Sequence, residues 1–593
     1  MKRNSLVLLL SIALIFGVSA TSSFGIGNTT QTTDALANCK YGTNPISEFT
    51  PATPNPSNTI NQLRNRDLSD PCAIYLMWTS EVGPSFSYSA LFARVNPSGA
   101  GQEIICNGAS DPACSADKFP NGGLRSLAGF YKCESESDIN CISQLVVTDP
   151  SGQTQDAKFE RYFPDAPQIP ASDNPKLVYP KGGSPILWSF DTPEGKKYIH
   201  SAGVTSRDWS SNGKEWQGPF TTFNFGLQAV TLHVEPNGIK PTLQATKYTM
   251  PDGTEGSRVE FVRPPNSPGG EGACRNWLVM DTGYCLANAD FAPGYRYRVI
   301  FQVPADLGFF LNGRLDAPVA FTEPLGKNRK LTIEGAPATL FMVSGTIPKK
   351  YLTPEAIAAI KGARSDFADE LVRVPTDLPP MENRYPDLLS ALLPYFGDRT
   401  TMELKAWTLK SSPTLGRYTN QCTNGGRGEM LGIISTNATA FNEDPPVLDP
   451  VTKIISYQVA APHFGVDGKT ENIGKYYMNM NANFIKCILG VDKVPTVAQI
   501  GITSTGQAER VSTVTVKTDK DWLRLNVDNF TFSSPKINVK FESASVPETN
   551  LAKNAEVKPA PVTTRKTITC VKGKTTKKIT ATNPKCPVGY KKK

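Results

Sequence analysis

Short apolar or alternating runs dominate the chain, and turn-forming residues separate them at intervals of roughly 8–15 residues. The clearest run is 295–303, in which Tyr295, Tyr297, Val299, Phe301 and Val303 occupy every second position. A period of two places these side chains on one face of a strand, and burying that face contributes several kcal/mol at ~25 cal/mol per Å². The pattern predicts a mainly β, multidomain protein of tandem sandwich-like modules.

Breaks in the pattern divide it into three β modules, at 61–165, 176–350 and 401–543. The first module has predicted strands at 73–78, 86–95, 127–132 and 143–148. The second has them at 185–190, 220–234, 241–250, 258–262, 295–303, 309–315, 330–334 and 339–344. The third has them at 403–409, 431–436, 453–460, 475–480, 485–489, 497–502, 512–517, 522–527 and 536–541. This strand spacing is typical of a sandwich.

A change of period at 351–398 predicts a small helical bridge between the second and third modules. Thr353 is a fair N-cap, and Pro354 suits the first turn of a helix because its missing N–H would be unpaired there anyway. A second short helix is expected at about 386–393, which is rich in leucine. We expect both helices to pack on the β modules.

The N-terminus has the features of a secretory signal peptide. Lys2 and Arg3 precede the apolar run Leu6–Val18, which is shorter than the roughly 20 residues that span a bilayer. Residues 1–26 are therefore expected to be removed on export, and the Thr/Asn/Pro-rich 27–60 to form a linker. With no later segment apolar enough to cross a membrane, the protein is predicted to lie outside the cell, at the cell surface or in the cell wall.

Positive charge is concentrated at the C-terminus. The whole chain has a net charge of +8, but the stretch from Lys553 to the end holds twelve Lys/Arg and one acidic residue, which is +11. The preceding 552 residues therefore carry −3. A Pro/Ala/Lys linker at 544–565 leads to a cationic Cys/Lys tail at 566–593. Such a tail seeks polyanions, which outside a cell are wall polymers, lipid headgroups or acidic glycans rather than nucleic acid.

The tail is predicted to fold as a small hairpin of 567–572 and 575–581, locked by a Cys570–Cys586 cystine. Lysines on its surface would then attach the protein to the envelope through electrostatic contacts that weaken with salt. The lysines assigned to attachment are Lys572, Lys574, Lys577, Lys578, Lys591, Lys592 and Lys593. The alternative is a basic tail that serves only solubility.

Twelve cysteines in an exported chain predict six disulfides. Pairing in sequence order gives Cys39–Cys72, Cys106–Cys114, Cys133–Cys141, Cys274–Cys285, Cys422–Cys487 and Cys570–Cys586. A metal role for these cysteines is not favoured, because there is no C-x-x-C spacing and the three histidines lie far from every cysteine cluster in sequence.

No catalytic motif is complete in the sequence. Asp281, Thr282 and Gly283 follow an apolar run as in an aspartic protease, but that chemistry needs two carboxylates that share a proton. A second Asp-Thr/Ser-Gly is absent, so a strand that ends in a turn is the better interpretation. The G-x-S-x-G, H-E-x-x-H and P-loop motifs are absent as well. No catalytic residue is assigned.

Calcium is the one cofactor for which the sequence offers candidate ligands. Glu134, Glu136 and Asp138 alternate inside the Cys133–Cys141 loop, and three carboxylates that converge can bind one Ca²⁺. The spacing lacks the glycine and the distal glutamate of an EF-hand. A solvated acidic loop is the alternative.

Aromatic residues crowd a Gly/Ser/Asn-containing segment at the front of the second module. Trp209 and Trp216, with Arg207 and Asp208 nearby, have the mixture of flat rings and polar groups that stacks on sugars. Phe220, Phe223 and Phe225 follow in the same stretch. Glycan contact is one interpretation, and aromatic packing into a β core is the other.

Two stretches resemble parts of known proteins. The third module, with Gly432–Ala438, Pro445, Pro446, Ser456–Ala460 and His463, resembles a β domain of uncharacterised exported proteins of actinobacteria. The 566–593 tail is similar to a short C-terminal Cys/Lys module of such proteins. The resemblance implies a cell-envelope protein and brings no known activity.

The sequence thus predicts a secreted, non-enzymatic protein of the cell surface or cell wall. It would bind a glycan or a partner protein, with the basic tail for attachment to an anionic envelope polymer. The alternative is an exported polysaccharide hydrolase whose paired carboxylates the sequence does not locate.

Overall fold

A computed structural model gives the fold of the chain. It describes residues 73–78, 89–95, 101–108, 110–118, 122–165, 169, 181–191, 197–209, 217–236, 238–240, 242–249, 253, 255–262, 280–305, 310–348, 352–363, 373–375, 385–412, 422, 430–442, 445–503, 510–519, 521–532 and 536–542, and in the tail 566–572, 575–581, 586 and 590–592. The predicted signal peptide and both predicted linkers lie outside these residues.

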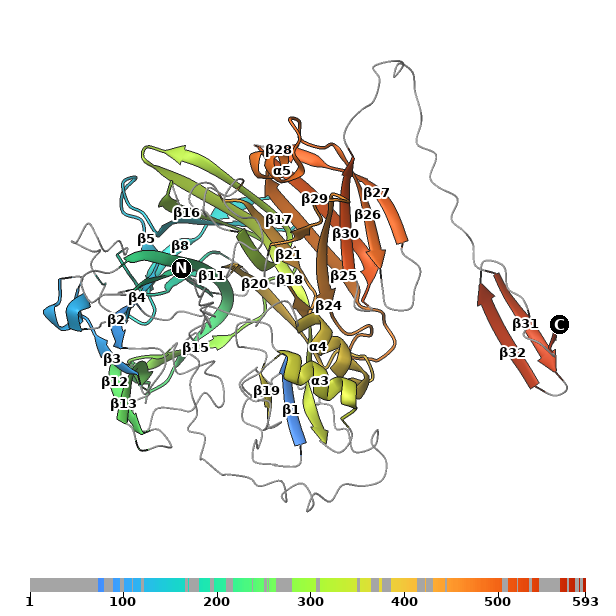
Figure 1. Cartoon of the computed structure of the whole chain (residues 1–593), viewed down its shortest axis with the longest axis horizontal. Helices are drawn as coiled ribbons and strands as arrows, with labels where there is room; N and C mark the ends of the chain where they lie inside the picture. The colour runs from blue at the N-terminus through green and yellow to red at the C-terminus, as the bar shows by residue number, and fades with distance from the viewer. Residues whose placement is uncertain are drawn as a thin grey trace, which may run out of the picture. The chain divides into compact units, whose positions relative to one another are not determined.

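The protein is mainly β, as the sequence predicts (Figure 1). Its central feature is a sheet whose strands lead round to the strand where they began. The strands in order around it are β6 (Cys141–Thr148), β7 (Thr154–Asp156), β8 (Lys158–Tyr162), β9 (Ile186–Ser189), β10 (Lys197–Trp209), β11 (Gln217–Val234), β20 (Met402–Ser411), β17 (Phe310–Leu325), β18 (Asn328–Pro348) and β16 (Arg296–Pro304). Each strand pairs with the next, except that β7 leads into β8 along the chain. β16 pairs back onto β6. We call this set the closed sheet.

A single residue, Ala157, connects β7 to β8, the one step around the closed sheet at which two consecutive strands do not pair. β7 pairs with β6 and β8 pairs with β9, and only Ala157 stands between β7 and β8. The Ala157 N–H donates to the Leu145 carbonyl on β6 at 2.8 Å, so the hydrogen-bonded edge continues through this residue. A sheet closed in this way leaves no long free edge for pairing with another chain.

Side chains fill the inside of the closed sheet. The alternating face of β16 confirms the prediction, since Tyr297, Val299 and Phe301 are fully buried. They join a core that includes Phe130, Trp188, Tyr198, Phe223, Phe225, Leu331, Ile333, Trp407 and Leu409. Several neighbouring rings meet edge-on, with centroids 5.0 Å apart for Phe225 and Phe301 and 5.5 Å for Phe225 and Trp407. Such aromatic pairs add stabilisation beyond their buried area.

A β-sandwich adjoins the closed sheet. One layer holds β21 (Gly432–Thr436), β25 (Ile473–Asn481), β29 (Trp522–Thr531) and β28 (Lys517–Asp519). The other holds β22 (Ala440–Phe441), β23 (Val447–Leu448), β24 (Ile454–Ala460), β30 (Lys536–Glu542), β26 (Val497–Thr503) and β27 (Arg510–Thr515). Both layers contribute to one core, which confirms sandwich-like packing for this region.

Further strands flank the closed sheet. These are β1 (Ala73–Trp78), β2 (Ala90–Val95), β3 (Gln102–Ile105), β4 (Gly123–Gly129), β5 (Tyr131–Lys132), β12 (Thr242–Thr249), β13 (Glu255–Val262), β14 (Met280–Asp281), β15 (Tyr284–Asn288) and β19 (Arg373–Pro375). Two short 3-10 helices, Pro112–Cys114 and Ala116–Lys118, follow β3.

The predicted helical bridge is present. It consists of α3 (Pro354–Ala363), α4 (Tyr385–Leu392) and the 3-10 helix Leu393–Phe396. Their apolar residues form a separate small core with Val343 of β18 and with Ala440 and Ala460 of the sandwich. Figure 1 shows α3 and α4 next to each other, with α4 at the end of β24. The bridge therefore packs on the β layers, as predicted.

The strand predicted at 485–489 is wrong, because these residues belong to the helix α5 (Ala482–Leu489). The Asn481 side chain accepts from the N–H groups of Asn483 and Phe484, and Gly490 ends the helix in a left-handed conformation with φ 69°. Both caps satisfy backbone groups that a helix end leaves unpaired. An apolar run this short does not distinguish a buried strand from a buried helix.

The predicted borders between the three β modules are not borders between sheets. β6 of the first predicted module pairs with β16 of the second, and β11 of the second pairs with β20 of the third. The closed sheet draws its strands from all three predicted modules. Turn-rich breaks in sequence mark the ends of strands, and they carry no information on which strands pair afterwards.

Compact packing separates the chain into two units, Met1–Ser543 and Ala544–Lys593. In the second unit, β31 (Lys566–Lys572), β32 (Thr575–Ala581) and β33 (Lys591–Lys592) pair in the order β32-β31-β33. The hairpin predicted from the tail sequence is present, and β33 adds a third strand to it.

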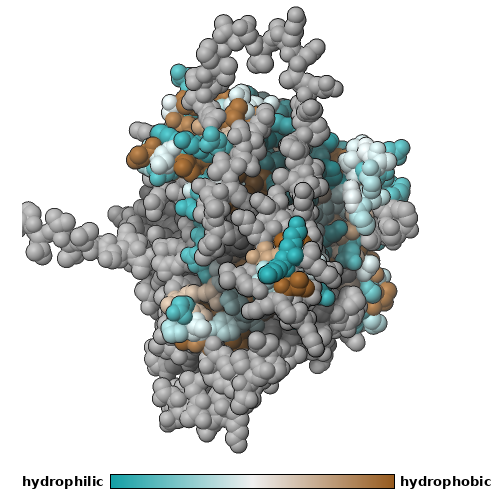
Figure 2. All heavy atoms as spheres, turned by 90° about the vertical axis from the view of Figure 1, so that its right-hand side faces the viewer, coloured by the Kyte–Doolittle hydropathy of each residue, from teal (hydrophilic) through white to brown (hydrophobic). Residues whose placement is uncertain are grey.

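The visible surface mixes polar and apolar side chains. On the face shown in Figure 2, hydrophilic and hydrophobic residues are interspersed among the described residues. Large apolar side chains that are exposed in the described part of the chain are Phe159, Val234, Ile239, Tyr284, Val451, Val466 and Ile473.

Candidate functional site

The C-terminal unit carries the predicted attachment lysines. β31 and β32 pair from Lys566 opposite Ala581 to Lys572 opposite Thr575, which leaves two residues for the turn. A two-residue loop is the tightest common hairpin connection. β33 then brings the end of the chain back beside β31, with Lys592 opposite Cys570.

The strand register places several of these lysines at paired positions of the C-terminal unit. Lys577 and Lys592 both stand opposite Cys570, while Lys578 stands opposite Thr569 and Lys591 opposite Val571. Lys591 and Lys592 are exposed, and Lys574, Lys593 and the side chains of Lys577 and Lys578 lie outside the described part of the chain. Positive charge concentrated in so short a unit attracts an anionic polymer.

Three of the six predicted cystines lie within the described side chains and are formed. They are Cys106–Cys114, Cys133–Cys141 and Cys422–Cys487. Cys285 and Cys586 are also disulfide-bonded. Cys39, Cys72 and Cys274 and the side chain of Cys570 lie outside the described part of the chain.

The three carboxylates proposed for calcium do not form a metal site. The Asp138 carboxylate accepts from the N–H groups of Glu134 at 2.7 Å and Ser135 at 2.9 Å, and these hydrogen bonds lower its pKa. Glu134 and Glu136 are exposed. Among the described residues, no group of three or more His, Cys, Asp or Glu side chains is arranged to hold a metal ion. The solvated acidic loop is the interpretation that the geometry supports.

Three of the four residues proposed for glycan contact lie on a strand. Arg207, Asp208 and Trp209 form the end of β10, which pairs there with β4 on one side and β11 on the other. Their side chains, and all of Trp216, lie outside the described part of the chain. The nearby Phe223 and Phe225 are buried inside the closed sheet, which confirms core packing for these two rings.

The Asp-Thr-Gly motif is a tight hairpin. Met280 pairs with Cys285 and Asp281 with Tyr284, and Gly283 takes a positive φ of 77° in the turn. The buried Asp281 carboxylate lies 3.5 Å from an Arg161 nitrogen and 3.8 Å from the Lys240 amine. This carboxylate thus balances two cations and has no second carboxylate beside it in the described ion pairs. The turn interpretation is confirmed.

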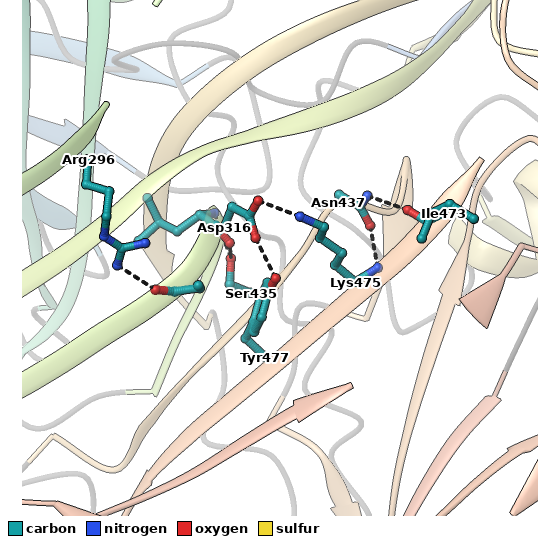
Figure 3. A network of polar contacts seen from close by, with 9 residues as sticks. Arg296, Asp316, Ser435, Asn437, Ile473, Lys475 and Tyr477 are labelled. Carbon is teal, nitrogen blue, oxygen red and sulfur yellow. Dashed lines mark hydrogen bonds and ion pairs between the residues drawn. The ribbon is translucent and has the colours of Figure 1, made fainter. Parts of the chain in front are cut away.

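A polar network joins the closed sheet to the sandwich (Figure 3). Asp316 on β17 faces two side chains of β25: one carboxylate oxygen accepts from the Tyr477 hydroxyl at 2.5 Å, and the other pairs with the Lys475 amine at 2.6 Å. Asp316 and Lys475 are about 160 residues apart in sequence. Tyr477 is buried, and burial together with the Asp316 charge raises its pKa, so the phenol stays protonated and donates.

A β-bulge aims Asp316 at β25. The β17–β18 register shifts between Asp316 and Val319, and Ala317 takes a positive φ of 47°. Such a conformation costs about 1–2 kcal/mol for a residue with a Cβ. Two side chains hold the bulge: Arg296 donates to the Ala317 carbonyl at 3.0 Å, and Asn479 donates to the Pro318 carbonyl at 2.8 Å. The bulge re-aims a side chain, as bulges commonly do.

The strand β21, which pairs with both β17 and β25, completes the network. The Ser435 hydroxyl on β21 donates to the Leu315 carbonyl at 2.7 Å. The Asn437 side chain accepts from the Lys475 N–H at 2.8 Å and donates to the Ile473 carbonyl at 2.9 Å (Figure 3). The network therefore spans β17, β21 and β25. A protonated phenol and an ion-paired lysine are suited to holding these strands together, and neither is poised as a base.

Sequence reasoning missed this network. Ser435, Lys475 and Tyr477 lie in strands that were predicted, but Asp316 lies just beyond the strand predicted at 309–315. These residues are polar at positions where a strand between two layers should be apolar. Tyr477 and Asn479 alternate with Met478 and Met480 along β25, and all four are buried. A polar row inside a strand buried on both faces is the signal that could have found it.

Arg314 is a second buried polar anchor. Its guanidinium donates to the carbonyls of Thr436, Ala438 and Thr439 and lies 4.2 Å from the centre of the Phe441 ring. These contacts hold the turn that connects β21 to β22. Five fixed donors suit arginine to capping several carbonyls at once.

His463 lies between two carboxylates in a loop of the sandwich. Its Nδ1 is 2.6 Å from the Phe532 carbonyl, which only accepts, so Nδ1 carries the proton. Its Nε2 lies 4.0 Å from a Glu471 oxygen, and its backbone N–H donates to Asp398. Burial raises the pKa of Asp398. A hydrolase would need a carboxylate pair with a defined separation across a substrate, and these contacts do not establish one.

Comparisons with known proteins add no relative. No protein-family model matches the chain, and no curated protein matches it. The resemblance of the third module and the tail to exported actinobacterial proteins therefore stays a prediction. Within the described residues, no helix has the length and apolar character needed to cross a membrane.

Proposed function

We propose that the protein is exported and acts at the cell surface or in the cell wall as a non-enzymatic binding protein, attached to an anionic envelope polymer by its C-terminal unit. One observation carries the proposal: the positively charged stretch and the separate C-terminal unit begin close together in the chain. The +11 charge begins at Lys553, and the separate compact unit begins at Ala544. A body of −3 joined to such a unit is suited to electrostatic attachment at one end only.

Two further features support attachment over a purely solubilising tail. A tail that serves only solubility needs charge but no fold, whereas this one pairs as three strands with a bonded cysteine. Strand pairing fixes the backbone positions of four lysines: Lys577 and Lys592 opposite Cys570, and Lys578 and Lys591 at neighbouring positions of the register. Fixed charges lose less conformational entropy on binding than the same charges on a flexible chain.

What the large unit recognises is a separate part of the proposal. A glycan or a partner protein is the expected class of ligand, with the segment around Trp209 and Trp216 as its first candidate site. Flat rings beside Arg207 and Asp208 are suited to a sugar that offers both an apolar face and hydroxyl groups.

The attachment proposal is tested with a lysine-neutral variant. Lys577, Lys578, Lys591 and Lys592 are changed together to Gln, which keeps side-chain length and removes four charges. Binding to isolated cell envelopes should fall strongly at about 0.1 M salt, where the Debye length is ~10 Å. At about 1 M salt, where it is ~3 Å, the variant and the native protein should bind alike.

A matched control variant distinguishes the effect of removing these four lysines from the effect of lowering the net charge of the whole protein. Four exposed lysines of the large unit are changed to Gln in the same way: Lys405, Lys493, Lys536 and Lys540. Both variants have the same net charge. If they lose envelope binding equally, the C-terminal unit has no special role and the proposal is wrong.

A further inference from the structure

His200 is buried among rings inside the closed sheet. It lies on β10, opposite Leu227 on β11 and Ile186 on β9. Its side chain is fully inaccessible, and its ring centroid is 5.8 Å from that of Phe301 and 6.4 Å from that of Phe225. Neither ring nitrogen has a hydrogen-bond partner among the residues that the structure describes. A neutral imidazole has one donor and one acceptor, so this burial already carries a cost.

The surroundings cannot accommodate a charged imidazole. The interior-facing residues next to it come from β9, β10, β11 and β16, and they are Ile186, Trp188, Tyr198, Phe225, Leu227, Tyr297 and Phe301. The titratable members of this set are the two tyrosines, whose hydroxyls hydrogen-bond to each other at 3.0 Å. Burial raises the pKa of Tyr297, so it stays uncharged in acid. No carboxylate of this set faces the histidine.

We propose that His200 makes the closed sheet acid-sensitive: uptake of a proton by its buried ring opens the sheet at β10 and exposes the aromatic interior. The ring cannot become charged in place, because a buried charge without a partner costs several kcal/mol. The proton is therefore bound only when β10 separates from its neighbours. This opening would change the surface that the large unit presents at the cell exterior, in response to local acidification.

The direction and size of the effect follow from linkage. Burial lowers the pKa of His200 from 6.5 to about 3. A lowered pKa means that the neutral ring favours the folded state above pH 6.5, and that this preference is lost as the pH falls toward 3. The equilibrium constant for opening should rise about tenfold per pH unit in this window, which is about 30-fold at pH 5 and about 300-fold at pH 4.

The small number of histidines makes a direct test practical. The chain has three, so full-length protein labelled with 13C-histidine gives three sets of ring signals, which single His→Gln variants assign. In the folded protein at pH 5, the His200 signal is expected to remain that of a neutral ring. A His200 signal that titrates near pH 6.5 while the amide exchange of β10 stays unchanged would overturn the proposal.

A second experiment measures the opening itself. Hydrogen exchange of the β10 and β11 amides is followed from pH 7.5 to pH 4, after correction for the intrinsic pH dependence of exchange. His200→Leu keeps the volume roughly constant and removes the titration, so the tenfold loss of protection per pH unit should disappear. His233→Gln, a change at an exposed position on β11, should retain it. Equal pH dependence in native protein and His200→Leu contradicts the proposal, and if His200→Leu does not fold, the ring titration of the native protein decides.

Discussion

Removing the Tyr477 hydroxyl tests whether the network of Figure 3 holds the closed sheet to the sandwich. The change is Tyr477→Phe, which keeps the ring in its buried place and deletes one donor to the Asp316 carboxylate. A hydrogen bond to a charged group is worth about 1.5–3 kcal/mol, because the partner that remains is left partly unsatisfied. We therefore expect a loss of about 2 kcal/mol in the free energy of unfolding of the large unit.

The ion pair in the same network should matter less. The Lys475 side chain is 38% exposed, and that of Asp316 is 28% exposed. Water screens a pair this accessible, and such pairs contribute about 0–1 kcal/mol. Lys475→Met should accordingly cost less than Tyr477→Phe, although both side chains contact the same carboxylate.

Denaturant unfolding of the protein, followed by tryptophan fluorescence, provides the measurement. Tyr457→Phe is the matched control, because the Tyr457 hydroxyl also donates at 2.5 Å but to the neutral carbonyl of Asn442. It should cost about 0.5–1.5 kcal/mol. A double-mutant cycle of Tyr477→Phe with Asp316→Ala should give a coupling energy of about 1.5 kcal/mol or more.

Two results would refute this reasoning. One is a cost for Tyr477→Phe that is no larger than that of the control. The other is a coupling energy to Asp316 near zero, which would show that the hydroxyl acts through another contact. The pKa of Tyr477 also predicts a pH effect: because it is raised above 10, the native protein loses stability as the pH rises above about 10, and Tyr477→Phe lacks this component.

Two further changes test the packing of the large unit. Val299→Asp puts a carboxylate on the fully buried face of β16 and should unfold the closed sheet, seen as loss of near-ultraviolet circular dichroism, whereas Val299→Ile should not. Replacing Cys422 and Cys487 together by Ala opens a loop with a sequence separation of 65 and should cost about 4 kcal/mol on the chain-entropy model, measured by urea unfolding against the native protein with its disulfides intact.

Local patterns were sufficient to predict most single elements. The period-two face of β16, the Thr353–Pro354 start of α3 and the two strands of the tail hairpin all depend on residues close together in sequence. Burial on one side of a strand or helix is visible in such patterns. Long strands were harder: β18 is one strand of 21 residues, where two short ones were expected.

Strand partners could not be predicted in the same way. The closed sheet joins β11 to β20 and β6 to β16, pairs that are far apart along the chain. β10 itself was missed, because Gly203 and the polar residues Ser201, Thr205 and Ser206 interrupt its apolar pattern. Once β10 is placed between β4, β9 and β11, both of its faces are buried, and the alternation that identifies a half-exposed strand is absent.

For the candidate sites, too, local patterns could be predicted and contacts that are distant along the chain could not. The tail was predictable because its charge and its cysteines form one local block. Sequence could not decide between calcium and a solvated loop at 133–141, because it shows which carboxylates are near one another but not which backbone N–H groups they accept from, as Asp138 does. The network around Asp316 depends on a bulge and on a strand some 160 residues away, and neither can be inferred from local spacing.

Envelope attachment by the C-terminal unit is the central claim, and its most direct measurement is the fraction of protein that stays with the cell envelope with and without residues 553–593. At low salt the complete protein should be retained, and the shortened protein should be released into the medium. The complete protein should be released as well when salt is raised to about 1 M. Retention of the shortened protein at low salt, equal to that of the complete protein, would contradict the account.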